Sequence, residues 1–461
     1  MSTVSQRYFA PQAWVEGRWQ ADVLLSIDAR GHWAAVEAGQ ACPPDAQRLQ
    51  GPVLPSLVDA HSHAFQRAFA GLAEQRDSDS DDFWSWRDRM YGVALRTTPA
   101  QLQAIAAQLY LELLRGGYTQ VCEFHYLHHQ DDGSAYPDEL AMSWALADAA
   151  EDAGLGLTML PVLYAHAGFA QPALRVDQRR FRTDAAWVWQ ASQRLNAAGR
   201  PLLNAGVALH SLRAAHAQDI RALQALVGDR DLPIHIHISE QQAEVRDCLA
   251  VTGRRPMAYL CEDFRPDERW QLVHATHSTP EEIAAVAASG AGAVICPTTE
   301  ANLGDGLCDL RGWLEAGVAL SLGSDSHVGR GWVEELRWLE YGQRLGLQQR
   351  NVAARPGVQP STAGRLFEAV RQGSAAPAGF RQWGLEVGAR ADFLVLDPAA
   401  SGLLGLPSSA TLDGLVFASQ GEVLQSVHVA GRQRLQQGRH ERQAEISGRF
   451  AVAMEALWRK T

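Results

Sequence analysis

The stretch Pro55–Glu74, PSLVDAHSHAFQRAFAGLAE, decides how the rest of the chain is interpreted. The apolar run Val53–Val58 predicts a short buried strand, which stops at Asp59 and is followed by His61 and His63. Alternate residues of an extended segment face the same way, so this spacing places two imidazoles on one side at a strand end. Each of their nitrogens can lie about 2.0–2.1 Å from one divalent metal ion. A bare His-x-His pair also occurs in structural roles, so the metal interpretation depends on the sequence downstream.

Downstream of this stretch, apolar strand-like runs alternate with helical patterns. Such alternation predicts a parallel sheet with helical crossovers, and eight units predict a (β/α)8 barrel. Helices are expected at Leu102–Leu114 and Glu281–Ala288, the second after the helix-start signal Ser278-Thr279-Pro280. The polar run Asp77–Asp82 is expected to be a loop. The eight runs are Val53–Val58, Thr119–Phe124, Leu157–Tyr164, Asn204–Leu209, Pro233–Ile238, Gln271–Ala275, Ala293–Cys296 and Val318–Leu322.

The two ends of the chain carry β-type patterns of their own. Because neither end is long enough to hold a core alone, we expect them to pair into one small β module; a surface extension without a module is the alternative. The strand-like segments are Ala13–Trp19, Ala21–Ile27, His32–Glu37, Asp392–Leu396 and Val423–Val429. The expected division is 1–52 and 384–461 for the two parts of the module, the second with a terminal helix, and 53–383 for the barrel.

Composition narrows the classes of protein and of partner. A hydrophobic content of 46% and a charged content of 20% fit a globular chain with a large core. The net charge of −11 argues against a nucleic-acid or anionic-membrane partner, although local arginines could still bind an acidic substrate. The six cysteines form no CxxC pair, which favours the reducing cytoplasm. The sequence lacks the pattern of a signal peptide and has no apolar run near the roughly 18 residues of a membrane span.

Side chains that bind metals collect at the ends of other predicted strands, where the active site of such a barrel lies. The fifth strand, PIHIHISEQ, ends with His237, and Glu240 follows it. The sixth, WQLVHATH, ends with His274, and the eighth, ALSLGSDSH, ends with Asp325. Each residue alone is more often structural, but their equivalent positions on different strands predict one common metal site.

The donor atoms indicate which of these groups bind the metal. Three nitrogens and one carboxylate oxygen form a set that suits zinc, with a water completing the shell. His235 is a rival ligand, but its deeper place in the strand favours a core role. The fourth strand, LLNAGVALHSL, contains no lysine that could bridge two metals, so one ion is expected. The predicted ligands are His61, His63, His237 and Asp325.

The remaining groups are candidates for proton transfer. Glu240 lies three residues after a ligand and should reach the reaction centre without binding the metal, so it is the candidate proton donor to a leaving nitrogen. His274 is placed to orient the metal-bound water or to take its proton, and Asp325 could also take that proton. The sequence does not separate these two.

The whole pattern resembles the amidohydrolase superfamily, in its mononuclear deaminase form. Within it, the chain is similar to deiminases that act on a formimino group. The resemblance implies a barrel with a small β-sandwich module from both termini, one Zn²⁺ per chain, and a homodimer. It also implies hydrolysis of N-formimino-L-glutamate to N-formyl-L-glutamate and ammonia in histidine degradation. The matching stretches, between Pro55 and Val328, are PSLVDAHSHAFQRAFAGLAE, DDFWSWRDRMYG, CEFHYLHH, HIHISEQ, LVHATH, CPTTEANLGDG and GSDSHV.

The resemblance also implies which residues hold a substrate with two carboxylates. Carboxylates are bound best by fork-shaped guanidinium groups, and Arg87 and Arg213 match substrate arginines of these deiminases. Gln66 is placed to contact the formimino end or a carboxylate. Tyr126 and His210 are polar partners carried over with the arginines.

Two other functions remain as alternatives. One is deamination of a nucleobase or a related C=N compound on the same scaffold, which two carboxylate-binding arginines argue against. The other is a metal-bound but inactive binding protein, which the full set of candidate catalytic groups argues against. The segment TTEANLGDG is expected to line the pocket, but Glu300 and Asn302 within it receive no role.

Overall fold

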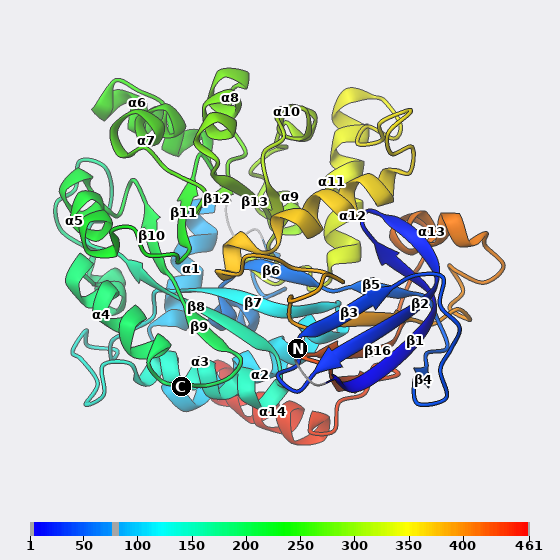
Figure 1. The fold of residues 1–461 in the computed structure, drawn as a ribbon. Helices are drawn as coiled ribbons and strands as arrows, with labels where there is room; N and C mark the ends of the chain where they lie inside the picture. Colours follow the sequence, from blue (N-terminus) through cyan, green and yellow to red (C-terminus); the bar gives the residue numbers. More distant parts are fainter. Residues whose placement is uncertain (1–3, 76–82, 460–461) are drawn as a thin grey trace.

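A computed structural model describes residues 4–75 and 83–459 of the chain (Figure 1). The loop expected at Asp77–Asp82 lies outside the described residues. A closed parallel barrel surrounded by helices forms the main body, and a mixed sheet built from both ends of the chain lies beside it (Figure 1). The predicted (β/α)8 fold class is confirmed.

The barrel closes because its strands pair in chain order and the last strand returns to the first. β14 pairs with β6, and β8 pairs with both β9 and β10, all in parallel. β9 and β10 share the fourth position and are separated by Gly206, where a Cβ would come 2.4 Å from the oxygen of Pro233. The strands are β6 (Leu57–Ser62), β7 (Tyr118–His125), β8 (Gly156–Leu163), β9 (Leu203–Ala205), β10 (Val207–Ser211), β11 (Ile234–Ile238), β12 (Trp270–His274), β13 (Gly292–Ile295) and β14 (Leu320–Leu322).

The helices follow the signals that the sequence carries. Thr279 caps α8, and its side chain and that of Glu282 form a reciprocal capping box, which confirms the predicted helix start. None of the helices in the described ranges is both long and apolar enough to cross a membrane. Those around the barrel are α1 (Phe83–Ala94), α2 (Pro99–Arg115), α3 (Ala141–Ala153), α4 (Ala185–Asn196), α5 (Ala217–Val227), α6 (Gln242–Thr252), α7 (Pro256–Phe264), α8 (Pro280–Ser289), α9 (Pro297–Leu303), α10 (Leu310–Ala316), α11 (Trp332–Leu347) and α12 (Thr362–Gly373).

The sheet from the chain ends has the order β17-β16-β15-β5-β1-β2-β3, with β4 beside β1. Its own core is formed by buried side chains such as Tyr8, Trp33 and Phe393. α13 (Thr411–Phe417) and α14 (Gln443–Trp458) complete the C-terminal part. The strands are β1 (Val4–Val15), β2 (Arg18–Asp28), β3 (Trp33–Glu37), β4 (Gln47–Arg48), β5 (Val53–Pro55), β15 (Phe393–Leu396), β16 (Leu424–Val429) and β17 (Arg432–Gln436).

Two predicted strands are wrong in their extent. The run Val53–Val58 is divided at Ser56: β5 pairs with β1 and β15 in the terminal sheet, and β6 belongs to the barrel and runs on to Ser62. The segment predicted as one strand at Ala13–Trp19 instead contains a hairpin turn at Glu16 and Gly17, with φ of 52° and 74°. In the first case the apolar run continues while the chain passes from one sheet to the other. In the second case the strand pattern continues through a hairpin turn, which only the turn residues indicate.

Gly373 lies where α12 crosses β14 at very short range. A Cβ there would come 1.8 Å from the main-chain oxygen of Leu320. We expect Gly373→Ala to lower the free energy of unfolding by about 1–3 kcal/mol through overpacking. Gly448 of α14 is a matched control, because a Cβ there meets nothing within 4 Å. Gly448→Ala should stabilise the chain by up to about 1 kcal/mol. Urea unfolding of both variants measures the difference, and equal effects would contradict the close packing.

Candidate metal centre and substrate cavity

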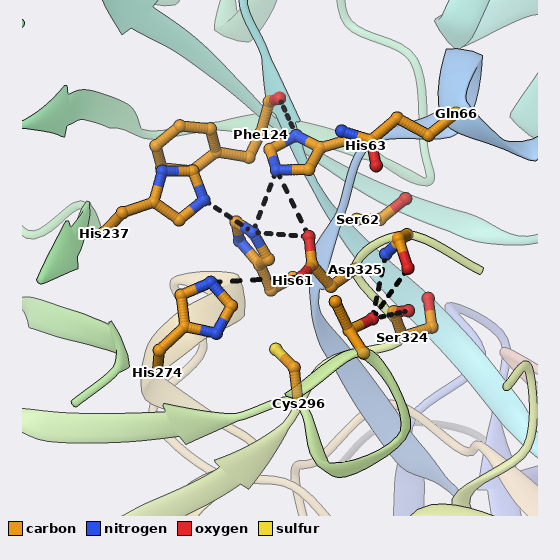
Figure 2. Close-up of polar contacts among 12 residues, drawn as sticks. His61, Ser62, His63, Gln66, Phe124, His237, His274, Cys296, Ser324 and Asp325 are labelled. Carbon is orange, nitrogen blue, oxygen red and sulfur yellow. Dashed lines mark hydrogen bonds and ion pairs between the residues drawn. The ribbon is translucent and has the colours of Figure 1, made fainter. Parts of the chain in front are cut away.

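The four predicted ligands converge on one point (Figure 2). The Nε2 atom of His61 lies 3.1 Å from that of His63 and 2.9 Å from that of His237. Oδ1 of Asp325 lies 3.4 Å from Nε2 of both His61 and His63. Ligands held at about 2.0–2.1 Å in a tetrahedron are about 3.3 Å apart, so these spacings fit a single zinc-sized ion. The four side chains are all buried, and together they form a buried His/Asp metal-binding site.

Hydrogen bonds to main-chain carbonyls set the tautomers of two ligands. Nδ1 of His63 donates to the oxygen of Phe124 over 2.9 Å, and Nδ1 of His237 donates to that of His210 over 2.8 Å. A neutral imidazole carries one proton, so the Nε2 atoms of both rings present lone pairs toward His61. Nitrogen lone pairs presented in this way are the donors that zinc takes from histidine. The donor set therefore fits a bound metal.

His235, the rival ligand, has another partner. Its Nε2 donates to the oxygen of Pro377 over 2.9 Å, and burial lowers its pKa to about 4. Among the described residues, His61 belongs to two sets of close donor atoms, one with His63 and Asp325 and one with His237 and His274. His274 therefore lies near enough to the ion to contact its water.

Backbone strain is concentrated beside the site. His274 has φ of 69° and Asp325 has φ of 48°, and Ala275, which follows His274, and Ser239, which precedes Glu240, also have positive values. This left-handed region is sparsely populated by residues other than glycine, and such residues cluster at functional sites, where the surrounding structure holds them. Here the strain aims an imidazole and a carboxylate at the same point.

Glu240 and His274 face each other beside the ligands. Oε1 of Glu240 lies 3.7 Å from Nε2 of His274, and Oδ2 of Asp325 lies 3.9 Å from the same nitrogen. Burial raises the pKa of Glu240, although His274 and Arg213 oppose this. Burial alone would lower the pKa of His274, but its carboxylate neighbours, Glu240 first, raise it to about 10. A carboxyl and an imidazole that lie in contact and have shifted pKa values are suited to proton transfer.

One cavity brings together most of the predicted residues. Leu303 is the one residue of the TTEANLGDG segment among those that line it. His61 lies beneath the cavity wall, fully buried, and does not line it. The predicted site residues that line the cavity are His63, Gln66, Arg87, Tyr126, His210, Arg213, His237, Glu240, His274 and Asp325.

The two arginines of the cavity both lie close to one aromatic ring. The guanidinium carbon of Arg87 is 4.5 Å from the ring centroid of Trp84, and that of Arg213 is 5.6 Å from it. Arg213 also lies 3.6 Å from Oε2 of Glu240, a contact that the sequence did not indicate. The Nε atoms of both arginines are buried and have no hydrogen-bond acceptor among the residues that the structure describes. Both groups can therefore donate further bonds to an anionic ligand.

Gln66 and Tyr126 form a polar pair on another part of the wall. Nε2 of Gln66 donates to the hydroxyl of Tyr126 over 3.2 Å, and Oε1 of Gln66 has no partner within residues 4–75 and 83–459. His210 lies beside Tyr164, with ring centroids 4.3 Å apart. Burial lowers the pKa of His210 well below its usual value, so the ring is neutral. These groups offer neutral donors and acceptors.

Two buried carboxyl groups to which the sequence analysis gave no role hold the segments that carry the ligands. Asp59 accepts hydrogen bonds from the amide and the hydroxyl of Ser324, at 2.9 and 2.6 Å. Glu123 accepts from the hydroxyl of Ser62 over 2.7 Å and from the amide of Ala64 over 2.6 Å. Burial raises the pKa of Asp59 to about 7 and that of Glu123 to about 8.

Comparison with known proteins places this site in a family. Residues 53–434 match the model of the amidohydrolase family, so the chain belongs to that family. It is a full-length homologue of the formimidoylglutamate deiminase of Pseudomonas aeruginosa, with 45% identity over 97% of this chain and 99% of that protein.

Solved structures agree with the fold. A crystal structure of an amidohydrolase from Brucella melitensis is 40% identical and has a TM-score of 0.92, covering 98% of this chain and 100% of that one. An adenosine deaminase from Xanthomonas campestris, solved with bound zinc, has a TM-score of 0.80 at 21% identity and covers 99% of both chains. At that identity the second likeness shows the fold alone.

We expect His237→Ala to lose its bound metal, because the site is left with one nitrogen fewer. The affinity for the metal should fall by more than the roughly 10–100-fold that is typical when a group hydrogen-bonded to a ligand is removed. His235→Ala, on the same strand, is the matched control and should keep its metal. Elemental analysis after purification without a chelator gives the metal content per chain. Equal contents in the two variants would contradict the ligand set.

Proposed function

We propose that this protein is a metal-dependent deiminase that hydrolyses N-formimino-L-glutamate to N-formyl-L-glutamate and ammonia, a step of histidine degradation. One observation carries the proposal: the converging donors of His61, His63, His237 and Asp325 lie beside a cavity that also holds two guanidinium groups. The full-length identity to a formimidoylglutamate deiminase supports the same substrate.

The proposed metal is one zinc ion per chain, held by three imidazoles and Asp325. When bound, such an ion lowers the pKa of a water ligand to about 7 and polarises the bond under attack. The nitrogen-rich donor set supports this choice over calcium or magnesium, which prefer oxygen ligands.

Different side chains around the metal site carry out the two proton transfers. His274 is placed to orient the attacking water or to take its proton, and Asp325 could also take that proton, because both side chains line the cavity and their nearest atoms lie 3.9 Å apart. Glu240, whose pKa burial raises, delivers a proton to the departing amino nitrogen. Ammonia leaves, and the formyl group stays on the glutamate nitrogen.

The remaining residues of the wall bind and orient the substrate. Arg87 and Arg213 would pair with the two carboxylates, since guanidinium forks match carboxylate geometry. The unpartnered Oε1 of Gln66 is available to the N–H groups of the formimino end. Tyr126 and His210 contribute neutral hydrogen bonds beside it.

Deamination of a nucleobase is the second candidate, and an assay of released ammonia separates the two. The purified chain should release ammonia from N-formimino-L-glutamate, and added zinc should raise the rate of metal-depleted samples. Adenosine, guanine and cytosine should give no release above background, because a neutral base offers no carboxylate to either arginine. Release from a nucleobase or nucleoside, with none from the formimino compound, would overturn the proposal.

Glu240→Gln should bind metal normally and lose turnover by about 10²–10⁴-fold, because the carboxamide cannot donate the proton. Gln242→Ala is the matched control, since this exposed side chain on the next helix contacts His277 outside the cavity. Steady-state kinetics and metal content are measured on both variants. Turnover near that of the unmodified chain in Glu240→Gln would remove Glu240 from the mechanism.

A further inference from the structure

The helix turn that follows β13 is tied to three neighbouring elements, although β13 contributes none of the four ligands. The turn opens α9 with three consecutive buried residues, Thr298, Thr299 and Glu300. Thr298 anchors it to α11: its amide donates to Oε2 of Glu335 over 2.9 Å, and its hydroxyl donates to Oε1 over 2.6 Å. The turn is therefore fixed to the crossover helix behind it.

Thr299 binds the segment that carries Asp325. Its hydroxyl donates to the main-chain oxygen of Ser324 over 3.3 Å and accepts from the amide of Ser326 over 3.2 Å. Both neighbours of Asp325 are thus held by one side chain.

Glu300 reaches the ring of His274. Its Oε1 lies 3.4 Å from Nδ1 of His274 and also accepts from the amide of Cys296 over 2.9 Å. An ionised carboxylate can only accept, so Nδ1 carries the proton. The opposite nitrogen, Nε2, then faces the carboxylates of Glu240 and Asp325. Glu300 is 4% exposed, so water does not replace it as the acceptor.

We propose that Glu300 is a positioning residue for the reaction at this site. By accepting the Nδ1 proton it fixes the plane and orientation of the His274 imidazole, so that Nε2 faces the reacting groups. Histidines that act beside metals depend on such outer partners. The inference rests on the proposed function, because it assigns His274 a part in that reaction. Glu300 acts through His274 and does not line the cavity.

The test compares two substitutions of similar size. Glu300→Met fills the same space without an acceptor, and Glu300→Gln keeps a carbonyl oxygen that can accept from both Nδ1 and the Cys296 amide. We expect Glu300→Met to lower kcat by about 10–100-fold, with KM and metal content unchanged. Glu300→Gln should keep kcat within about fivefold of the unmodified chain, since the hydrogen bond survives. Glu300→Ala replaces Glu300→Met if the latter does not fold.

Two controls separate positioning from general damage. Asn302 lies on the same helix, is exposed and bonds to Glu74 over 2.9 Å, so Asn302→Ala should leave kcat unchanged. A downfield imidazole N–H resonance in the proton NMR spectrum, assigned by its loss in His274→Asn, should persist in Glu300→Gln and vanish in Glu300→Met.

The outcomes distinguish failure of this inference from failure of the proposed function. Unchanged kcat in Glu300→Met, a loss of metal that matches the loss of activity, or a persistent N–H resonance would each overturn the role of Glu300. Absence of turnover of N-formimino-L-glutamate by the unmodified, metal-loaded chain would instead overturn the proposed function. The NMR comparison would still show whether Glu300 holds His274.

Discussion

The metal site depends on three imidazole nitrogens that are held close together around one point. The Nε2 atoms of His63 and His237 approach that of His61 to 3.1 and 2.9 Å. The protons of the first two rings are committed elsewhere, to the carbonyls of Phe124 and His210. Each carbonyl belongs to the neighbouring barrel strand, so the pairing of β6 with β7 and of β10 with β11 sets the tautomers. The closed barrel therefore supplies the carbonyl groups that orient the histidine rings of the metal site.

Burial strengthens the electrostatic interactions at the metal site. Asp59 and Glu123 each accept several hydrogen bonds, yet burial dominates and raises the pKa of both carboxyls. Their environment thus has a low effective dielectric constant, in which Coulomb interactions are stronger than in water. A divalent ion placed here interacts strongly with Asp325, and it offsets the cost of burying that carboxylate. In the same environment a donor or acceptor without a hydrogen-bond partner lowers the stability of the fold. This accounts for the several hydrogen bonds that Ser324 makes.

The convergence of His61, His63, His237 and Asp325 could be predicted from sequence because each of them follows an apolar run, and a barrel brings all such positions to one face. Asp59 was missed although it shares the alternating face of His61 and His63; a carboxylate in that position was interpreted only as the end of a strand. Glu300 was missed for a different reason. Its partner, His274, lies 26 residues away, and an acidic residue near the start of a helix is common whatever its function. Only the tertiary structure shows that Glu300 contacts His274 and that Asp59 bonds to Ser324.

Charged groups of both signs line the cavity, and they bear on the substrate. The guanidinium carbons of Arg87 and Arg213 lie 4.5 and 5.6 Å from the ring centroid of Trp84, and Arg213 also lies 3.6 Å from Oε2 of Glu240. A formimino group is cationic when protonated, and the rest of the proposed substrate carries two negative charges. Two guanidinium groups match two carboxylates in charge and geometry, and a cationic formimino group matches the carboxylate of Glu240. A neutral nucleobase would offer no carboxylate to either arginine, which favours the proposed deiminase over a nucleobase deaminase.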